Sequence, residues 1–151
     1  MDLQALSDRA GIQDLLARYC HVVDRRDWAA FSALFSDDAV LDYSAFGGPR
    51  CGAADMATYL DGALAPIDGT QHTISTSVVE LSGDTASART AAQVMMISAA
   101  ADGSPHVLFV GLWYRDVLVR TPQGWRIRER TQESAWMHNL PQDKQPPATA
   151  T

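Results

Sequence analysis

The sequence predicts an α+β fold in which about three helices pack on the concave face of a cone-shaped, curved β-sheet, antiparallel or mixed. Helical spacing of apolar residues dominates the chain up to Pro66, and long segments rich in β-branched residues follow from Gln71. A curved sheet capped by helices encloses a cavity that suits a small molecule. We expect one domain over residues 1–137 and a flexible, polar, proline-rich tail over residues 138–151.

Three segments carry the signals of helices. In the first, apolar residues recur at helical spacing, and Ser7 is a suitable N-cap. The apolar stripe of this helix consists of Ile12, Leu15, Leu16, Tyr19, Cys20 and Val23. A second, short helix is expected from about Asp27 and should end at the sequence SDD. Its apolar face consists of Trp28, Phe31, Leu34 and Phe35. A third helix is expected over residues 54–64.

The strands are expected to be one short and four long. The short strand covers residues 39–46, and the loop GGPRCG follows it. The long strands are separated by the turn sequences SGD, ADGSP and PQG. They are expected over residues 72–82, 85–99, 106–121 and 125–136.

The composition excludes several classes of function. The chain has 151 residues and a formal net charge of −6, and its basic residues alternate with acidic ones, which argues against nucleic-acid binding. No apolar run reaches the roughly 20 residues that cross a bilayer, and the acidic N-terminus lacks the order of a signal peptide. We therefore expect a cytoplasmic protein that binds neither nucleic acid nor membranes.

Motifs for metals, cofactors and nucleophiles are missing from the sequence. Cys20 and Cys51 fit no metal spacing and no disulfide framework, and we expect both to be small buried hydrophobic residues. The four histidines form no closely spaced pair that a carboxylate could complete into a metal site. The chain also lacks G-x-S-x-G, a P-loop and G-x-G-x-x-G. No cofactor is expected.

Asp24 is an unusual residue for its place in the first helix. It follows Cys20 by one turn, at the edge of the buried stripe. A negative charge at a helix C-terminus opposes the helix dipole, so a carboxylate that faces inward there needs a partner. A structural contact with Arg25 or Arg26 and a functional role are both open from spacing alone.

Other polar and aromatic residues have a structural and a functional interpretation. His72 opens the first long strand, and His106 begins a later one, where it could point into the mouth of a cavity. The ring of Tyr19 belongs to the core, but its hydroxyl needs a partner. Tyr43 could pack or reach the cavity, and Trp113 is expected in the core or the cavity wall.

Three stretches of the sequence resemble the SnoaL-like branch of the nuclear transport factor 2-like superfamily: IQDLLARYCHVVDRRDWAAFSALFSDDAVLDYS, GTQHTIS and GLWYRDVLVRTPQGWRIRERT. The resemblance extends over residues 7–136 and implies the curved-sheet fold. In motif it is closest to scytalone dehydratase and hexachlorocyclohexane dehydrochlorinase. The superfamily hosts many reactions and also proteins without catalysis, so the fold alone does not give the reaction.

The resemblance implies roles for particular residues. In both enzyme groups an aspartate at the end of the first helix pairs with a histidine on the sheet, and these positions fall on Asp24 and His72. The stretch LDYSAF places Tyr43 on a tyrosine that polarises the substrate through water in the dehydratase. His106 lies about one residue from the position of a second family histidine. Val23 stands where the dehydratase has a tyrosine, so the substrate is not carried over.

The implied activity is that of a cofactor-independent lyase, a dehydratase or related eliminase, acting on a small, mostly apolar cyclic substrate. His72 would remove a proton from carbon, and Asp24 would hold the other ring nitrogen and stabilise the imidazolium. Tyr43 would assist where charge develops on oxygen. Tyr19, His106 and Trp113 are expected to contact the substrate.

Two other functions remain open. The same pair of residues could serve an isomerase or cyclase of polyketide or steroid type. A non-catalytic ligand-binding protein or oligomeric scaffold is the third hypothesis, but a scaffold has no need for a buried acid–base pair. Alternating apolar residues in HVLFVGLWYRDVLV predict that another subunit covers part of the sheet's outer face, in a homodimer or homotrimer.

Overall fold

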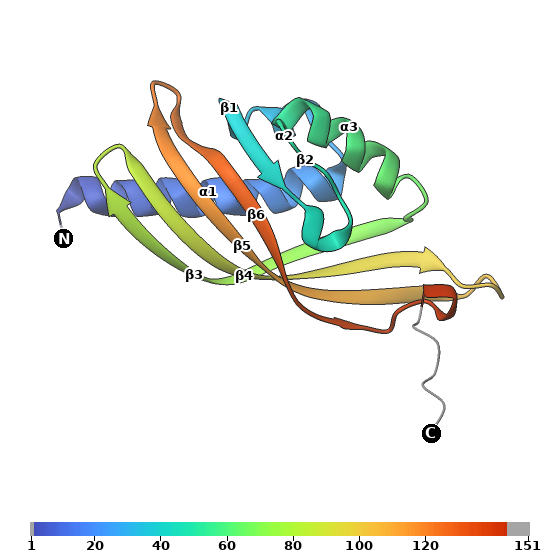
Figure 1. The fold of residues 1–151 in the computed structure, drawn as a ribbon. Coiled ribbons are helices and arrows are strands. Elements are labelled where there is room, and N and C mark those ends of the chain that lie inside the picture. The colour runs from blue at the N-terminus through green and yellow to red at the C-terminus, as the bar shows by residue number, and fades with distance from the viewer. Residues whose placement is uncertain (1, 145–151) are drawn as a thin grey trace.

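Six strands form one mixed sheet in the order β2-β1-β6-β5-β4-β3, and helix α1 lies across one of its faces (Figure 1). The computed structural model describes residues 2–144. The helices are α1 (Leu3–Arg25), α2 (Trp28–Ser32) and α3 (Ala53–Leu64), with short 3₁₀ turns η1 (Ser44–Phe46) and η2 (Gln142–Lys144). The strands are β1 (Phe35–Asp42), β2 (Arg50–Cys51), β3 (Gly69–Ser82), β4 (Thr85–Ala99), β5 (Pro105–Thr121) and β6 (Gly124–His138).

The α+β fold class with three helices on a curved sheet is confirmed. Neighbouring strands are antiparallel except β1 and β6, which run parallel, so the sheet is mixed. All members of the predicted stripe of α1 are at most 6% exposed. This stripe packs α1 against β3 and β6 and forms the centre of the core.

Several predicted boundaries differ from the structure. Helix α1 begins at Leu3 because the carboxylate of Asp2, not Ser7, accepts the capping hydrogen bond, from the backbone N–H of Ala5 at 2.7 Å. Asp27 caps α2 as predicted. This helix ends at Ser32, however, and Phe35 begins strand β1, where it pairs with Ile127 of β6.

The short strand and the loop after it also differ from the prediction. Strand β1 covers Phe35–Asp42, so it includes the sequence SDD, and the 3₁₀ turn η1 follows it. Two residues of the predicted loop, Arg50 and Cys51, form the short strand β2. A short segment can pair its backbone with a neighbouring strand although its own sequence has no strand pattern.

The long strands bend where their pairing shifts register. Such shifts occur between Ile74 and Ser77 of β3 and at two places along β5 and β6. At one of them Gly111 lies against the ring of Trp136, and a Cβ at position 111 would come within 2.2 Å of that ring. Bulges increase twist and bend a strand, so these irregularities curve the sheet around α1.

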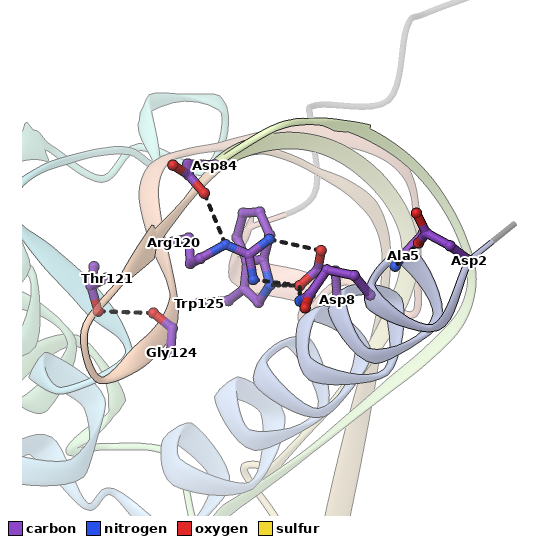
Figure 2. Close-up of polar contacts among 9 residues, drawn as sticks. Asp2, Ala5, Asp8, Asp84, Arg120, Thr121, Gly124 and Trp125 are labelled. Atoms are coloured by element: carbon purple, nitrogen blue, oxygen red, sulfur yellow. Dashed lines mark hydrogen bonds and ion pairs between the residues drawn. The ribbon is translucent and has the colours of Figure 1, made fainter.

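The N-terminal half of α1 is fixed to the sheet by the buried carboxylate of Asp8. Figure 2 shows the Arg120 guanidinium between Asp8 and Asp84. Arg120 Nη2 donates to Asp8 Oδ2 at 2.7 Å, and the indole N–H of Trp125 donates to Asp8 Oδ1 at 3.1 Å. The hydrogen bonds from Arg120 hold the pKa of Asp8 well below its usual range, although desolvation acts in the opposite direction.

Among residues 2–144, no helix combines the length and apolar character needed to cross a membrane. Large apolar side chains that are exposed on the sheet include Val78, Phe109 and Trp136, and the homodimer or homotrimer stays a prediction. The domain boundary at residue 137 also stays a prediction: β6 ends at His138, and residues 145–151 of the predicted tail lie outside the described residues.

Replacing Asp8 by asparagine should lower the urea concentration at the unfolding midpoint at about pH 7. The amide cannot accept the charge-assisted hydrogen bonds that join α1 to Arg120. The matched control is Asp14→Asn, since Asp14 is an exposed carboxylate of the same helix with a surface ion pair to Arg18. This control should have little effect. Equal midpoints for the Asp8→Asn variant and the unsubstituted protein would contradict the anchoring role.

Candidate active site

Asp24 lies in the last turn of α1, where the chain ends the helix and turns toward α2. The turn closes with hydrogen bonds from the backbone N–H of Arg26 to the Val23 carbonyl and from that of Asp27 to the Val22 carbonyl. Arg26 is left-handed, with φ 56°, as residues just after a helix often are. Its guanidinium donates to the Ile67 carbonyl, shortly before β3 begins. This end of the helix is therefore fixed beside the start of β3.

The Asp24 carboxylate accepts three hydrogen bonds from β3. His72 Nδ1 lies 2.6 Å from Oδ1, the backbone N–H of His72 donates to Oδ2 at 2.9 Å, and the Thr70 hydroxyl donates to Oδ1 at 2.9 Å. The carboxylate thus has partners that offset the unfavourable helix dipole at this position. The structure brings Asp24 and His72 into direct contact, with the hydrogen-bond geometry that an acid–base pair requires.

The charge of Asp24 depends on this contact. Burial raises the pKa of Asp24, but the hydrogen bonds from His72 and Thr70 outweigh it, so the pKa is lowered from its ordinary value. Asp24 is therefore ionised near neutral pH. An ionised carboxylate can only accept, so a neutral His72 ring carries its proton on Nδ1. The other ring nitrogen, Nε2, is then the basic one, and it has no hydrogen bond to any of residues 2–144.

A cavity of about 710 Å³ lies beside this pair, and His72 is in its wall. Most of its apolar lining comes from α1, α3, β4 and β5, and Phe46 of η1 and Ile67 before β3 contribute to it. The apolar residues on the four elements include Val23, Leu60, Leu64, Val94, Met96, Leu108, Val110 and Leu112. The polar residues of the lining are His72, Ser98, Gln132, Asp143, Lys144, the exposed Tyr59 and three buried tyrosines, Tyr19, Tyr43 and Tyr114. The size and the lining are typical of a site for a small apolar ligand.

Two of the three tyrosines, Tyr19 and Tyr114, pack against a buried arginine on β6. Arg130 is 1% exposed and forms a two-fold hydrogen bond with Asp116, at 2.7 and 2.8 Å. Its guanidinium lies 4.1 Å from the ring centroids of both Tyr19 and Tyr114. The hydroxyls of Tyr19 and Tyr43 lie 2.6 Å apart and form a hydrogen bond with each other. Sequence reasoning did not single out Arg130, Tyr114 or Thr70.

Four of the six residues expected at the site are brought together. Tyr19, Tyr43 and His72 line the cavity, and Asp24 contacts His72 from behind. Tyr19 packs edge-on against the His72 ring, with centroids 6.3 Å apart. The ring of Tyr19 is thus in the core, as expected, and its hydroxyl has Tyr43 as its partner.

The other two residues, Trp113 and His106, are not in the lining of this cavity, and their contact with a substrate stays a prediction. Trp113 points to the opposite face of the sheet from its neighbours Leu112 and Tyr114, because side chains alternate along a strand. Its ring lies under the Arg89 guanidinium, 4.1 Å from the ring centroid. His106 is the second residue of β5, and its Nε2 is 2.8 Å from the carbonyl oxygen of Asn139.

Within the described part of the chain, no three or more His, Cys, Asp or Glu residues are grouped so as to hold a metal ion. Both cysteines are free; Cys20 is buried and Cys51 is half-buried. Burial raises the pKa of the Cys20 thiol to about 11, which suits the structural role expected of it.

Replacing Asp24 by asparagine should reduce the free energy of unfolding by about 1–2 kcal/mol at about pH 7, because the charged hydrogen bonds to β3 are weakened. A carboxylate with a lowered pKa stabilises the fold above its unfolded-state pKa of 3.8. This stabilisation is lost as the pH falls through the folded-state value. Urea unfolding along a pH series should thus show the two proteins converging below about pH 4. A difference that stays constant down to the acid limit would contradict this account.

Comparison with known proteins places the chain in a family. The SnoaL-like domain family matches residues 4–131. An uncharacterized protein of Mycobacterium tuberculosis is 36% identical over 132 residues, which cover 87% of this chain and 88% of that protein. Among solved structures, a protein from Kribbella flavida has a TM-score of 0.81 at 25% identity, and the match covers 89% of this chain and 95% of that one.

A type 2 hexachlorocyclohexane dehydrochlorinase has a TM-score of 0.76 at 22% identity, with 99% of this chain and 100% of that chain covered. At this identity the likeness shows a shared fold. Together with the match over residues 4–131, these findings establish that the chain belongs to the SnoaL-like domain family of the nuclear transport factor 2-like superfamily.

Proposed function

We propose that the protein is a cofactor-independent lyase, of the dehydratase or eliminase type, in which Asp24 and His72 remove a proton from a carbon atom of the substrate. The observation that carries the proposal is the 2.6 Å contact between Asp24 Oδ1 and His72 Nδ1, which leaves His72 Nε2 for a molecule in the cavity. A histidine oriented in this way by a carboxylate is a general base suited to neutral pH.

The reaction begins when His72 Nε2 accepts a proton from carbon. The electrons of the C–H bond end in a double bond to the neighbouring carbon, from which the leaving group departs with its own bonding electrons. Asp24 stabilises the imidazolium, which can then give its proton to the leaving group, so that loss of a hydroxyl group produces water. No oxidant or reductant is consumed. The apolar wall of the cavity strengthens the Asp24–His72 interaction, because it keeps water away.

The substrate that fits is small and mostly apolar. The cavity volume of about 710 Å³ suits one or two fused rings with short substituents, and most of the lining side chains carry no polar group. Family membership supports a reaction without a cofactor, as do dehydrochlorinases among the proteins with this fold. An isomerase or cyclase would use the same two residues, and product analysis separates these reactions from elimination.

The test is turnover of a panel of cyclic β-hydroxy carbonyl compounds, with loss of water followed by mass spectrometry. His72→Ala should reduce kcat by roughly 10²–10⁴-fold while the circular dichroism spectrum is unchanged. His21→Ala, which removes an exposed histidine of α1, is the matched control and should keep full activity. A fully active His72→Ala variant would exclude this function, and rearranged products without loss of water would favour the isomerase.

A further inference from the structure

The hydroxyl group of Tyr114 is a buried donor without a partner. Tyr114 is 1% exposed, and its oxygen makes no hydrogen bond of good geometry with the residues that the structure describes, since the neighbouring Tyr19 hydroxyl is paired with that of Tyr43. Most buried hydroxyl groups have a partner, so one that lacks it needs an explanation. Tyr114 lines the same cavity as His72, which means that a bound molecule could supply the missing acceptor.

The other two buried tyrosines of the cavity differ in this respect. Tyr19 and Tyr43 satisfy each other through the hydrogen bond of 2.6 Å between their hydroxyls. Tyr114 packs against the ring of Tyr19, with ring centroids 5.4 Å apart, and His72 packs against the same ring at 6.3 Å. Tyr114 and His72 therefore pack against the same Tyr19 ring and lie in the wall of one cavity.

The fixed positive charge of Arg130 makes Tyr114 a stronger donor. The guanidinium lies against the Tyr114 ring, 4.1 Å from its centroid, and Asp116 holds it there with two hydrogen bonds. A cation on the face of a phenol withdraws electron density from the hydroxyl group. The hydroxyl group then donates a stronger hydrogen bond to a negatively charged acceptor oxygen. Burial nevertheless raises the pKa of Tyr114 well above its usual value, so the phenol keeps its proton and can donate it in a hydrogen bond.

We propose that Tyr114 donates a hydrogen bond to a carbonyl oxygen of the substrate, and that the substrates are carbonyl compounds with the reacting C–H next to that carbonyl group. This inference rests on the proposed function of His72 as the base. When Nε2 takes the proton, the electron pair of the C–H bond moves to the carbonyl oxygen and forms an enolate. Tyr114 holds the enolate oxygen. The carbonyl then re-forms, and the returning electron pair forms the double bond between the α- and β-carbons. The leaving group departs with the electrons of its bond to the β-carbon and takes the proton from the His72 imidazolium.

A hydrogen bond from Tyr114 distinguishes two substrate classes that His72 alone cannot distinguish. A β-hydroxy or β-acyloxy ketone develops charge on the oxygen that Tyr114 contacts, so the contact strengthens in the transition state. A halogenated hydrocarbon has no such oxygen and would leave the Tyr114 hydroxyl unpaired. We therefore expect carbonyl substrates to be turned over in preference to halogenated hydrocarbons of the same ring size.

Tyr114→Phe is the variant that tests the inference, because it keeps the ring against Arg130 and removes only the hydroxyl group. With a β-hydroxy ketone, kcat should fall by roughly 10²-fold with little change in KM, as expected for a contact that strengthens in the transition state. Arg115→Gln is the matched control: Arg115 is the next residue of β5, its side chain is 63% exposed, and it should leave kcat unchanged. An unchanged kcat for Tyr114→Phe overturns the inference.

Binding of β-naphthol, an aromatic enol whose oxygen imitates the enolate, gives a second readout that does not depend on turnover. Its fluorescence should report binding to the unsubstituted protein and roughly tenfold weaker binding to Tyr114→Phe. If His72→Ala abolishes turnover but Tyr114→Phe alters neither kcat nor naphthol binding, the inference fails and the proposed function stands. If naphthol binding depends on Tyr114 but no carbonyl compound is turned over, the contact is supported and the proposed lyase function fails.

Discussion

The arrangement of the site depends on the hydrogen bonds that join the Asp24 carboxylate to β3. The carboxylate sits in the last turn of α1, where the helix dipole disfavours a negative charge, and accepts three hydrogen bonds from the first residues of β3. At the other end of α1, Asp8 is held by Arg120 and Trp125. The helix is thus tied to the sheet near both ends, and the distance between Asp24 and His72 follows from the way it crosses the sheet.

A second buried charge lies against two tyrosines of the cavity wall. Arg130 and Asp116 are 1% exposed each, and the desolvation of such a pair offsets much of its attraction. The ion pair therefore contributes little net stability to the fold. Its position against the rings of Tyr19 and Tyr114 gives it a second effect, since it places a positive charge next to the phenols in the cavity wall. The proposed base, His72, and the phenols next to this cation therefore lie in the wall of the same cavity.

Much of the fold could be predicted from the sequence, because its signals are local. The apolar stripe of α1 and the long β-branched segments follow from spacing alone. The pairing of Asp24 with His72 could not be predicted in this way, since 48 residues separate them in the chain. Spacing marked Asp24 as unusual, and the family resemblance supplied the partner.

Two features of the site were hidden by the geometry of the strands. Strand β5 carries apolar or aromatic residues on both faces, so its sequence does not say whether Trp113 or Tyr114 faces the cavity. In β6, a register shift opposite Val117 and Leu118 interrupts the alternation of side chains. The next buried residue after Ile127 is therefore Arg130. Strict alternation would place Glu129 inside instead. A bulge of this kind depends on long-range pairing and has no reliable signature in the sequence.

The tautomer of His72 decides which ring nitrogen can act as the base, and long-range proton–nitrogen NMR of the neutral histidine rings measures it directly. We expect Nδ1 of His72 to carry the proton and Nε2 to carry none. Asp24→Asn should shift the ring toward the opposite tautomer, because the amide can donate to Nδ1. A His72 ring protonated at Nε2 in the unsubstituted protein would contradict the assignment of this nitrogen as the base.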